Sequence, residues 1–202
     1  MRRALLLVAA LAGACLMTPA QAQTPGGYAG IGVMAVSTDN ARDFASIFIG
    51  PGGSADKSAG GLKLYGGYQW PNRFGIEAGL YNLGTYEVLA SGTKSDEFEV
   101  SALAVSGTYA IPMGTSSDLT LKLGLAFTNV DYTCLSSCGG IFVNTSKSGV
   151  AGLLGGGVGW RITPKFSLRA DLELFGGVNH SVGGLEAEYG YGALSLSGQV
   201  KF

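Results

Sequence analysis

The sequence predicts an all-β protein, a single eight-stranded antiparallel up-and-down β-barrel that spans a membrane. Eight segments alternate apolar and polar residues, which is the spacing of strands with two different faces. Short turns and long polar connections alternate between these segments. Only 13% of the residues are charged and the mean hydropathy is positive, yet no apolar segment after residue 22 is long enough for a membrane-spanning helix. A barrel whose apolar outer face contacts lipid explains all three observations.

Residues 1–22 have the features of a cleaved signal peptide. Arg2 and Arg3 precede an apolar run over residues 4–16, and Ala20-Gln21-Ala22 fits the small-x-small cleavage rule. We therefore expect export by the Sec pathway and a single mature domain over residues 23–202. A lipoprotein signal with Cys15 as the lipidated residue is the alternative, although Ala12 stands where Leu is preferred.

The first four expected strands run approximately over 28–36, 61–70, 74–83 and 98–111. Their two faces separate clearly by residue type. In the second strand, Leu62, Leu64, Tyr68 and Trp70 lie opposite Lys63, Tyr65 and Gln69. In the third, Phe74, Ile76, Ala78 and Leu80 lie opposite Glu77, and in the fourth, Leu103, Val105, Tyr109 and Ile111 lie opposite Ser106 and Thr108.

The last four expected strands run over 119–129, 150–162, 166–174 and a final segment that ends at Phe202. The fifth strand has the cleanest alternation, because Leu or Phe occupies every second position from Leu119 to Phe127. The sixth places Leu154, Val158, Trp160 and Ile162 away from Arg161, and the seventh places five apolar residues opposite Arg169, Asp171 and Glu173. Each segment has about the 9–11 residues that a tilted strand needs to cross a bilayer.

The connections indicate which way the barrel is oriented. Those at 71–73, 112–118 and 163–165 contain turn-forming Pro and are short. Those at about 37–60, 84–97, 130–149 and 175–188 are long, which is typical of loops outside the cell. Both termini then lie on the periplasmic side. Six aromatic residues expected near that side would form an interfacial girdle: Trp70, Phe74, Tyr109, Trp160, Phe166 and Phe202.

Seven charged residues fall on the face expected to line the barrel: Lys63, Glu77, Lys122, Arg161, Arg169, Asp171 and Glu173. The interior of an eight-stranded barrel is just wide enough for side chains to fill it. A buried charge without a partner is costly, so we expect a network of ion pairs, with an ion or proton path as the alternative. Inward glycines, including Gly155, Gly157 and Gly159, would make room for the larger side chains.

Cys134 and Cys138 are the cysteines that remain after loss of the signal peptide. In an exported protein, a pair this close in sequence predicts a disulfide that closes a small loop. A metal site is the alternative, but no further ligand residues lie nearby in the sequence.

The chain resembles the opacity-protein-like, or porin-like, outer-membrane β-barrel family. The resembling segments are GGLKLYGGYQWPNRFGIEAGLYNLG (60–84), LTLKLGLAF (119–127), GGGVGWRITPKFSLRADLELF (155–175) and SLSGQVKF (195–202). The resemblance implies an integral protein of the Gram-negative outer membrane that contacts lipid and lipopolysaccharide and exposes variable loops. The last strand, with Leu196, Val200 and Phe202, resembles the signal by which such proteins engage their insertion machinery. No peptidoglycan-binding domain is expected after the barrel.

We expect a non-enzymatic surface protein with an envelope or adhesion-type role, without cofactor or bound metal. Phe44 and Phe48 are candidate loop contacts for a host or surface ligand. A lipid A deacylase is one alternative, with His180 and Ser181 beside Glu186 or Glu188, but adjacent strand residues point to opposite faces. A small-solute channel is the other. Loss of Arg2 and Arg3 leaves 11 basic and 14 acidic residues, a net charge of −3, and no basic cluster indicates nucleic acid.

Overall fold

The computed structural model describes residues 25–38, 54–55, 58–90, 93–134, 145–182 and 185–202. Within these ranges the chain forms eight long antiparallel strands and one strand of two residues, β2 (Ser54–Ala55). The long strands are β1 (Gly26–Thr38), β3 (Ser58–Gln69), β4 (Phe74–Ala90), β5 (Thr93–Pro112), β6 (Ser117–Cys134), β7 (Thr145–Arg161), β8 (Phe166–Val182) and β9 (Leu185–Lys201). The described residues contain no helix long and apolar enough to cross a membrane.

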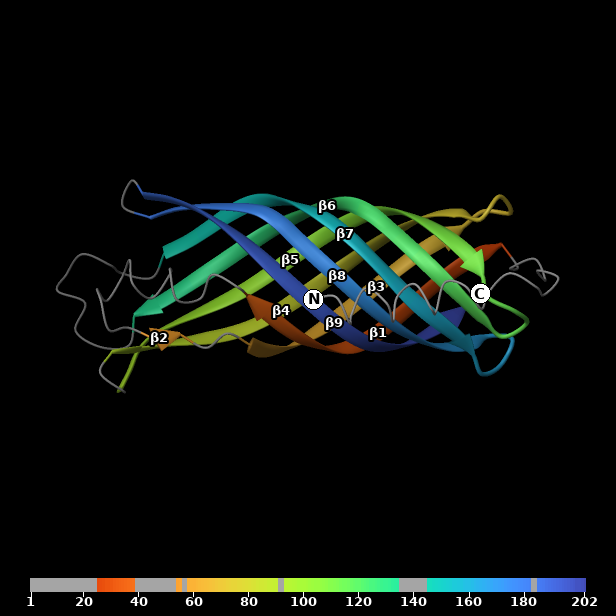
Figure 1. Ribbon diagram of the computed structural model, residues 1–202, viewed down its shortest axis with the longest axis horizontal. Helices are drawn as coiled ribbons and strands as arrows, with labels where there is room; N and C mark the ends of the chain where they lie inside the picture. Colours follow the sequence, from red (N-terminus) through yellow and green to blue (C-terminus); the bar gives the residue numbers. More distant parts are fainter. Residues whose placement is uncertain (1–24, 39–53, 56–57, 91–92, 135–144, 183–184) are drawn as a thin grey trace, which may run out of the picture.

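The sheet closes into a barrel, as the sequence predicts. The long strands pair in the order β4-β3-β1-β9-β8-β7-β6-β5, and a further pairing of β4 with β5 completes the ring. The first and last strands are neighbours, with Tyr28 opposite Lys201 and Thr38 opposite Tyr191. All backbone pairs are antiparallel, so the connections run up and down around the barrel (Figure 1).

Three tight connections lie at one end of the barrel, which we call the turn end. It contains residues 70–73, 113–116 and 162–165, together with the start of β1 and the end of β9, on the right in Figure 1. The first turn is closed by a backbone hydrogen bond from Trp70 N to Phe74 O (2.8 Å), and Arg73 adopts a left-handed conformation with φ of 71°. In the last turn the Thr163 hydroxyl accepts a hydrogen bond from Phe166 N (3.0 Å). The three predicted short turns are therefore confirmed.

Two of the four predicted long loops at the opposite end, the loop end, are wrong. β4 continues to Ala90 and β5 begins at Thr93, so the segment 84–97 is mostly strand. Likewise, β8 continues to Val182 and β9 begins at Leu185, which places most of 175–188 in strands. Of the predicted loop 130–149, residues 130–134 and 145–149 are also strand, and the rest lies outside the described residues. Most of the predicted loop 37–60 lies outside the described residues.

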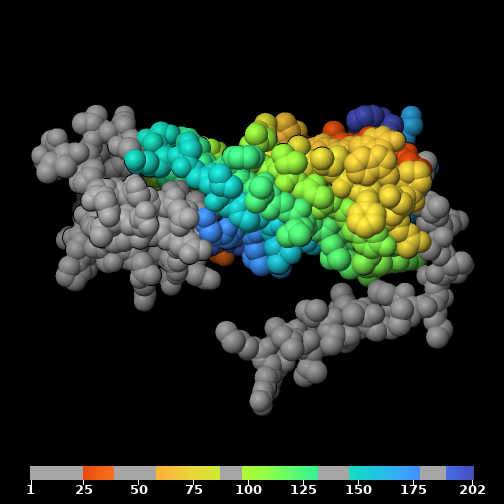
Figure 2. All heavy atoms as spheres, turned by 90° about the horizontal axis from the view of Figure 1, so that it is seen from above, coloured from red at the N-terminus to blue at the C-terminus, as the bar shows by residue number. Residues whose placement is uncertain are grey.

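The outer surface carries a wide belt of apolar side chains. On β6 these are Leu121, Leu123, Leu125 and Phe127, and on β9 they are Leu194, Leu196 and Val200, followed by Phe202 directly after the strand. Leu123, near the middle of the belt, is 71% exposed. Figure 2 shows this outer surface over β3 to β6 as a continuous wall of side chains. Exposed apolar residues on every long strand are what a lipid-facing surface requires and what a surface in water avoids.

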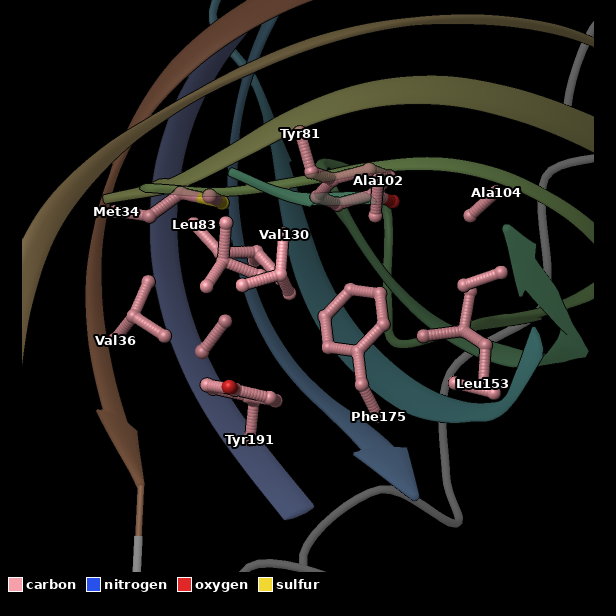
Figure 3. Packing of buried hydrophobic residues seen from close by; sticks show 14 of the residues in the cluster. Met34, Val36, Tyr81, Leu83, Ala102, Ala104, Val130, Leu153, Phe175 and Tyr191 are labelled. Atoms are coloured by element: carbon pink, nitrogen blue, oxygen red, sulfur yellow. The ribbon is translucent and has the colours of Figure 1, made fainter. Parts of the chain in front are cut away.

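The apolar face changes sides toward the loop end, and this change explains the missed strand segments. Beyond the belt the outward positions are polar, as at Glu99 and Asp131, whereas the inward positions become apolar. Sixteen buried residues form this inner apolar cluster, including Val36, Leu83, Tyr86, Phe98, Val100, Val130, Leu153, Phe175 and Tyr191. Their side chains meet across the lumen (Figure 3). Because the strand continues while the apolar positions change phase, the segment no longer matches one two-residue pattern.

Candidate functional site

The barrel interior is arranged in three layers, which are seen most simply along β8. Ser167 lies near the turn end, followed by Arg169, Asp171 and Glu173 at alternate positions, and then by Phe175 in the apolar cluster. All five side chains are buried. The alternation of a strand therefore places one polar layer, one charged layer and one apolar layer on the same inward face.

The charged layer brings together six of the seven predicted interior charges. Lys63 of β3 contacts two carboxylates of β8, with its Nζ 3.2 Å from Asp171 Oδ2 and 2.9 Å from Glu173 Oε2. Lys122 of β6 lies between the walls, 2.7 Å from Glu77 Oε1 and 2.7 Å from Glu173 Oε1. Each lysine pairs with carboxylates on strands that are not adjacent to its own, because its ammonium group reaches across the lumen.

Arg169 completes the network from β8. Its Nε donates to Asp171 Oδ1 (2.8 Å), and its Nη1 donates to Glu77 Oε2 (2.8 Å) on the opposite side of the lumen. The six residues comprise three cations and three carboxylates, so their formal charges balance. We define these six residues, Lys63, Glu77, Lys122, Arg169, Asp171 and Glu173, as the interior ion network.

Three tyrosines extend the network. Tyr28 donates a hydrogen bond to Glu77 Oε2 (3.0 Å), and Tyr81 donates one to Glu173 Oε1 (3.0 Å). The Tyr65 ring lies beside all three cations, with Lys63 Nζ 4.8 Å, Lys122 Nζ 5.9 Å and Arg169 Cζ 5.5 Å from its centroid. The phenols of Tyr28 and Tyr81 fill carboxylate lone pairs, and the face of Tyr65 adds cation–π attraction inside the desolvated layer.

Small residues opposite the network provide the space it occupies. A Cβ atom at Gly157 of β7 would overlap Asp171 Oδ1, and one at Gly30 of β1 would lie 2.5 Å from the Tyr65 ring. Gly155 similarly borders the Cγ of Glu173 at 3.1 Å. An eight-stranded barrel has little interior room, so long charged side chains on β3, β6 and β8 fit only because neighbouring inward positions lack side chains.

Arg161 is the predicted interior charge that does not join the network. It lies at the turn end of β7, opposite Ser167 of β8, and is half-buried. Its Nε and Nη2 atoms are buried and have no hydrogen-bond partner among the residues that the structure describes. Arg161 therefore occupies an inward position, as its alternation predicts. The nearest carboxylate on the neighbouring strand β8, that of Asp171, lies further along the barrel and pairs with Lys63 and Arg169.

Several predicted sites lie outside the described part of the chain or at its edge. The signal peptide (1–22), Phe44, Phe48 and Cys138 are outside it, and Cys134 is the last residue of β6, opposite Asp96. His180 and Ser181 are successive residues of β8, opposite Ala187 and Glu186 of β9. Leu196, Val200 and Phe202 share the outward face of the last strand, and Phe202 is 81% exposed.

The sequence reasoning missed the roles of Tyr28 and Tyr81 and the entire inner apolar cluster. Tyr65 was expected on the inward face through its alternation with Lys63. The same count from Glu77 places Tyr81 on that face, since the two are four residues apart on β4. The apolar cluster has no such signal, because its members occupy inward positions where the pattern of the membrane belt predicts polar residues.

The interior ion network is a set of mutually paired charges. The described residues contain no group of three or more His, Cys, Asp or Glu side chains placed to hold a metal ion. The carboxylates of Glu77, Asp171 and Glu173 are each bonded to two or three cations. What the network does physically is hold opposite walls of the barrel together and fill the lumen between them.

The closed eight-stranded barrel and its lipid-facing belt agree with the protein family that the sequence matches. The family model described as "Outer membrane protein beta-barrel domain" matches residues 6–177. The chain belongs to this outer-membrane barrel family. The protein is therefore an outer-membrane β-barrel, and the turn end lies in the periplasm while the loop end faces outward. No protein of curated function matches the chain in sequence.

Solved structures of the same architecture agree. Neisserial surface protein A is 16% identical, with a TM-score of 0.61, over 88% of this chain and 97% of its own. OprG of Pseudomonas aeruginosa is 13% identical, with a TM-score of 0.66, over 91% and 99%. Ail, the attachment invasion locus protein of Yersinia pestis, is 16% identical, with a TM-score of 0.56, over 88% and 99%, in a complex with the heparin analogue sucrose octasulfate. At this identity the likeness concerns the fold.

Proposed function

We propose that this protein is a non-enzymatic, non-conducting surface protein of the outer membrane, with a structural or adhesion-type role in the envelope. The filled lumen is the observation that supports this proposal. The interior ion network occupies the middle of the barrel, and the apolar cluster occupies the half nearer the loop end. A solute would have to displace paired charges and then cross a layer of packed apolar side chains.

The extension of the strands beyond the belt favours a role outside the cell. Among the β8 residues whose side chains are described, the last outward apolar residue is Leu174, whereas the strand continues to Val182. The packed interior, including Phe175 and Tyr191, fills the barrel on this side of the ion network and supports the strand walls. Phe44 and Phe48, in the connection between β1 and β3, are the proposed contacts for a host or surface ligand.

The membrane-facing surface supports the remaining proposed partners. Its apolar belt is suited to outer-membrane lipid and lipopolysaccharide, and the outward row of Leu196, Val200 and Phe202 is suited to the insertion machinery. We further propose that residues 1–22 are removed on export.

The adhesion role is tested by attachment of cells that display the protein. The double variant Phe44→Ser/Phe48→Ser removes two apolar loop residues without altering any described strand. We expect it to reach the outer membrane, to keep the gel shift on boiling that marks a folded barrel, and to lose attachment. Attachment equal to wild type, with the barrel folded, would refute the role of these residues.

The absence of catalysis is tested by mass spectrometry of lipid A from cells that express the protein. A deacylase would remove one acyl chain, and His180→Ala would abolish that loss because His180 is the chain's single histidine. We expect the lipid A profile to be the same with wild type, with His180→Ala and with an empty vector.

A further inference from the structure

A small polar cavity lies on the periplasmic side of the interior ion network. Its volume is about 30 Å³, and its walls include Thr120 of β6, Ser167 and Arg169 of β8, and Gln199 and Lys201 of β9. Gln69 and Tyr28 close it from β3 and β1. Every one of these side chains carries a hydrogen-bond donor, and the ion network separates the cavity from the apolar cluster.

The cavity is lined by a buried donor that the protein leaves unused. Arg169 is 5% exposed and uses Nε and Nη1 for Asp171 and Glu77, but its Nη2 has no hydrogen-bond partner among the described residues. Arg161, opposite Ser167 in the register, has two more buried nitrogens without partners, Nε and Nη2. Leaving buried donors of charged groups unpaired is costly, so such donors indicate a bound species.

The charges around the cavity specify the sign of that species. Lys201 lines the cavity and makes no salt bridge with any described residue. Asp118 and Lys201 in the cavity wall carry opposite charges, and the charge of Arg169 is balanced within the interior ion network. Arg161 is not part of the wall but lies within electrostatic reach of Lys201, so it leaves one positive charge in excess. Water would satisfy the free N–H groups but would leave this excess of positive charge uncompensated.

We propose that this cavity binds a small inorganic anion of halide size. Arg169 Nη2 provides the buried hydrogen bond, and Lys201 and Arg161 provide the compensating charge. The volume fits about two water-sized species, since one water needs roughly 10–15 Å³ of such space. A lipid phosphate or a sugar is too large. The site is separate from the proposed outer surface, because its lining residues Gln69, Asp118 and Lys201 lie at the turn end of their strands.

Anomalous diffraction tests the location of the anion. The refolded wild-type barrel is crystallised with sodium bromide in place of chloride, and data are collected at the bromine absorption edge. We expect an anomalous peak in the cavity within hydrogen-bonding reach of Arg169 Nη2. Ordered water in the cavity without an anomalous peak would refute the proposal.

A matched pair of lysine variants tests binding in solution. Lys201→Gln removes a cation from the cavity, whereas Lys165→Gln removes an exposed cation from the 162–165 turn at the same end. Thermal unfolding in a neutral detergent is followed as bromide replaces methanesulfonate at constant ionic strength. We expect bromide to raise the unfolding midpoint of wild type and of Lys165→Gln, as binding to the folded state requires.

For Lys201→Gln we expect the same rise to need about tenfold more bromide, because a charge-assisted contact is lost. Equal bromide dependence in the two variants, or none in wild type, would refute a specific site. Arg161→Gln removes the neighbouring cation that acts on Lys201 and has the same expected direction. Each variant is first checked for the gel shift of a folded barrel.

Discussion

At the scale of single residues, the balance of the interior ion network is what makes its charges compatible with burial. Glu173 contacts Lys63 and Lys122 and accepts a hydrogen bond from Tyr81. Removing one member leaves the others desolvated without a full set of partners, which costs more than the network contributes as a whole. The stability of the network therefore depends on the presence of all six charged residues, and it is not a sum of independent ion pairs.

Glu173→Gln is expected to lower the free energy of unfolding by about 3–5 kcal/mol, because it leaves two buried lysines short of a carboxylate. Urea unfolding of the barrel in lipid vesicles measures this change. The control is Glu99→Gln, an exposed carboxylate on β5 that accepts a hydrogen bond from Asn82, for which we expect a change within about 0.5 kcal/mol. Similar small effects of the two variants would contradict the burial of a coupled network.

At the scale of strands, the membrane determines which face of each strand is apolar. Within the belt the outward positions of β6 are Leu or Phe and the inward ones include Lys122, whereas nearer the loop end the inward position is Val130 and the outward one is Asp131. The two-residue pattern predicted the membrane-spanning parts of all eight strands. It did not predict the extension of β4 to β9 toward the loop end, because the described inward positions there, such as Val100 and Phe175, are apolar.

Leu123→Arg places a charge in the middle of the belt and is expected to cost about 2–4 kcal/mol, because lipid does not solvate the guanidinium group. Thr85→Arg is the matched control, since Thr85 is exposed on β4 beyond the belt, opposite Glu99. For that variant we expect at most about 1 kcal/mol. Urea unfolding in vesicles measures both, and equal costs would contradict the assigned position of the belt.

The connection between β6 and β7 carries the predicted disulfide. We expect Cys134 and Cys138 of the exported protein to be linked, because the pair is close in sequence and the compartment is oxidising. Mass spectrometry after treatment with iodoacetamide should show no adduct on the mature chain until a reductant is added, and two adducts afterwards. Alkylation of both cysteines without reduction would show that they are free thiols.

At the scale of the whole molecule, the barrel is a membrane-spanning cylinder with three different interior layers. The sequence predicted the eight strands, their closure, the three tight turns and the inward placement of the charges, since all of these depend on alternation within single segments. Which charges pair depends on contacts across the lumen, for example between Lys122 and Glu77 on strands that are not neighbours. Alternation along one strand carries no information on such contacts. It therefore predicts that Arg161 faces inward but not that Arg161 stays outside the interior ion network.

The most direct test of the filled lumen is the electrical conductance of the refolded wild-type barrel in a planar lipid bilayer. The protein is delivered by fusion of vesicles whose folded fraction is known from the gel shift, so that a silent bilayer still contains folded barrels. We predict no discrete conductance steps above those of protein-free vesicles, because paired charges and packed apolar side chains fill the lumen. Stable ohmic steps that scale with the folded fraction would contradict the account.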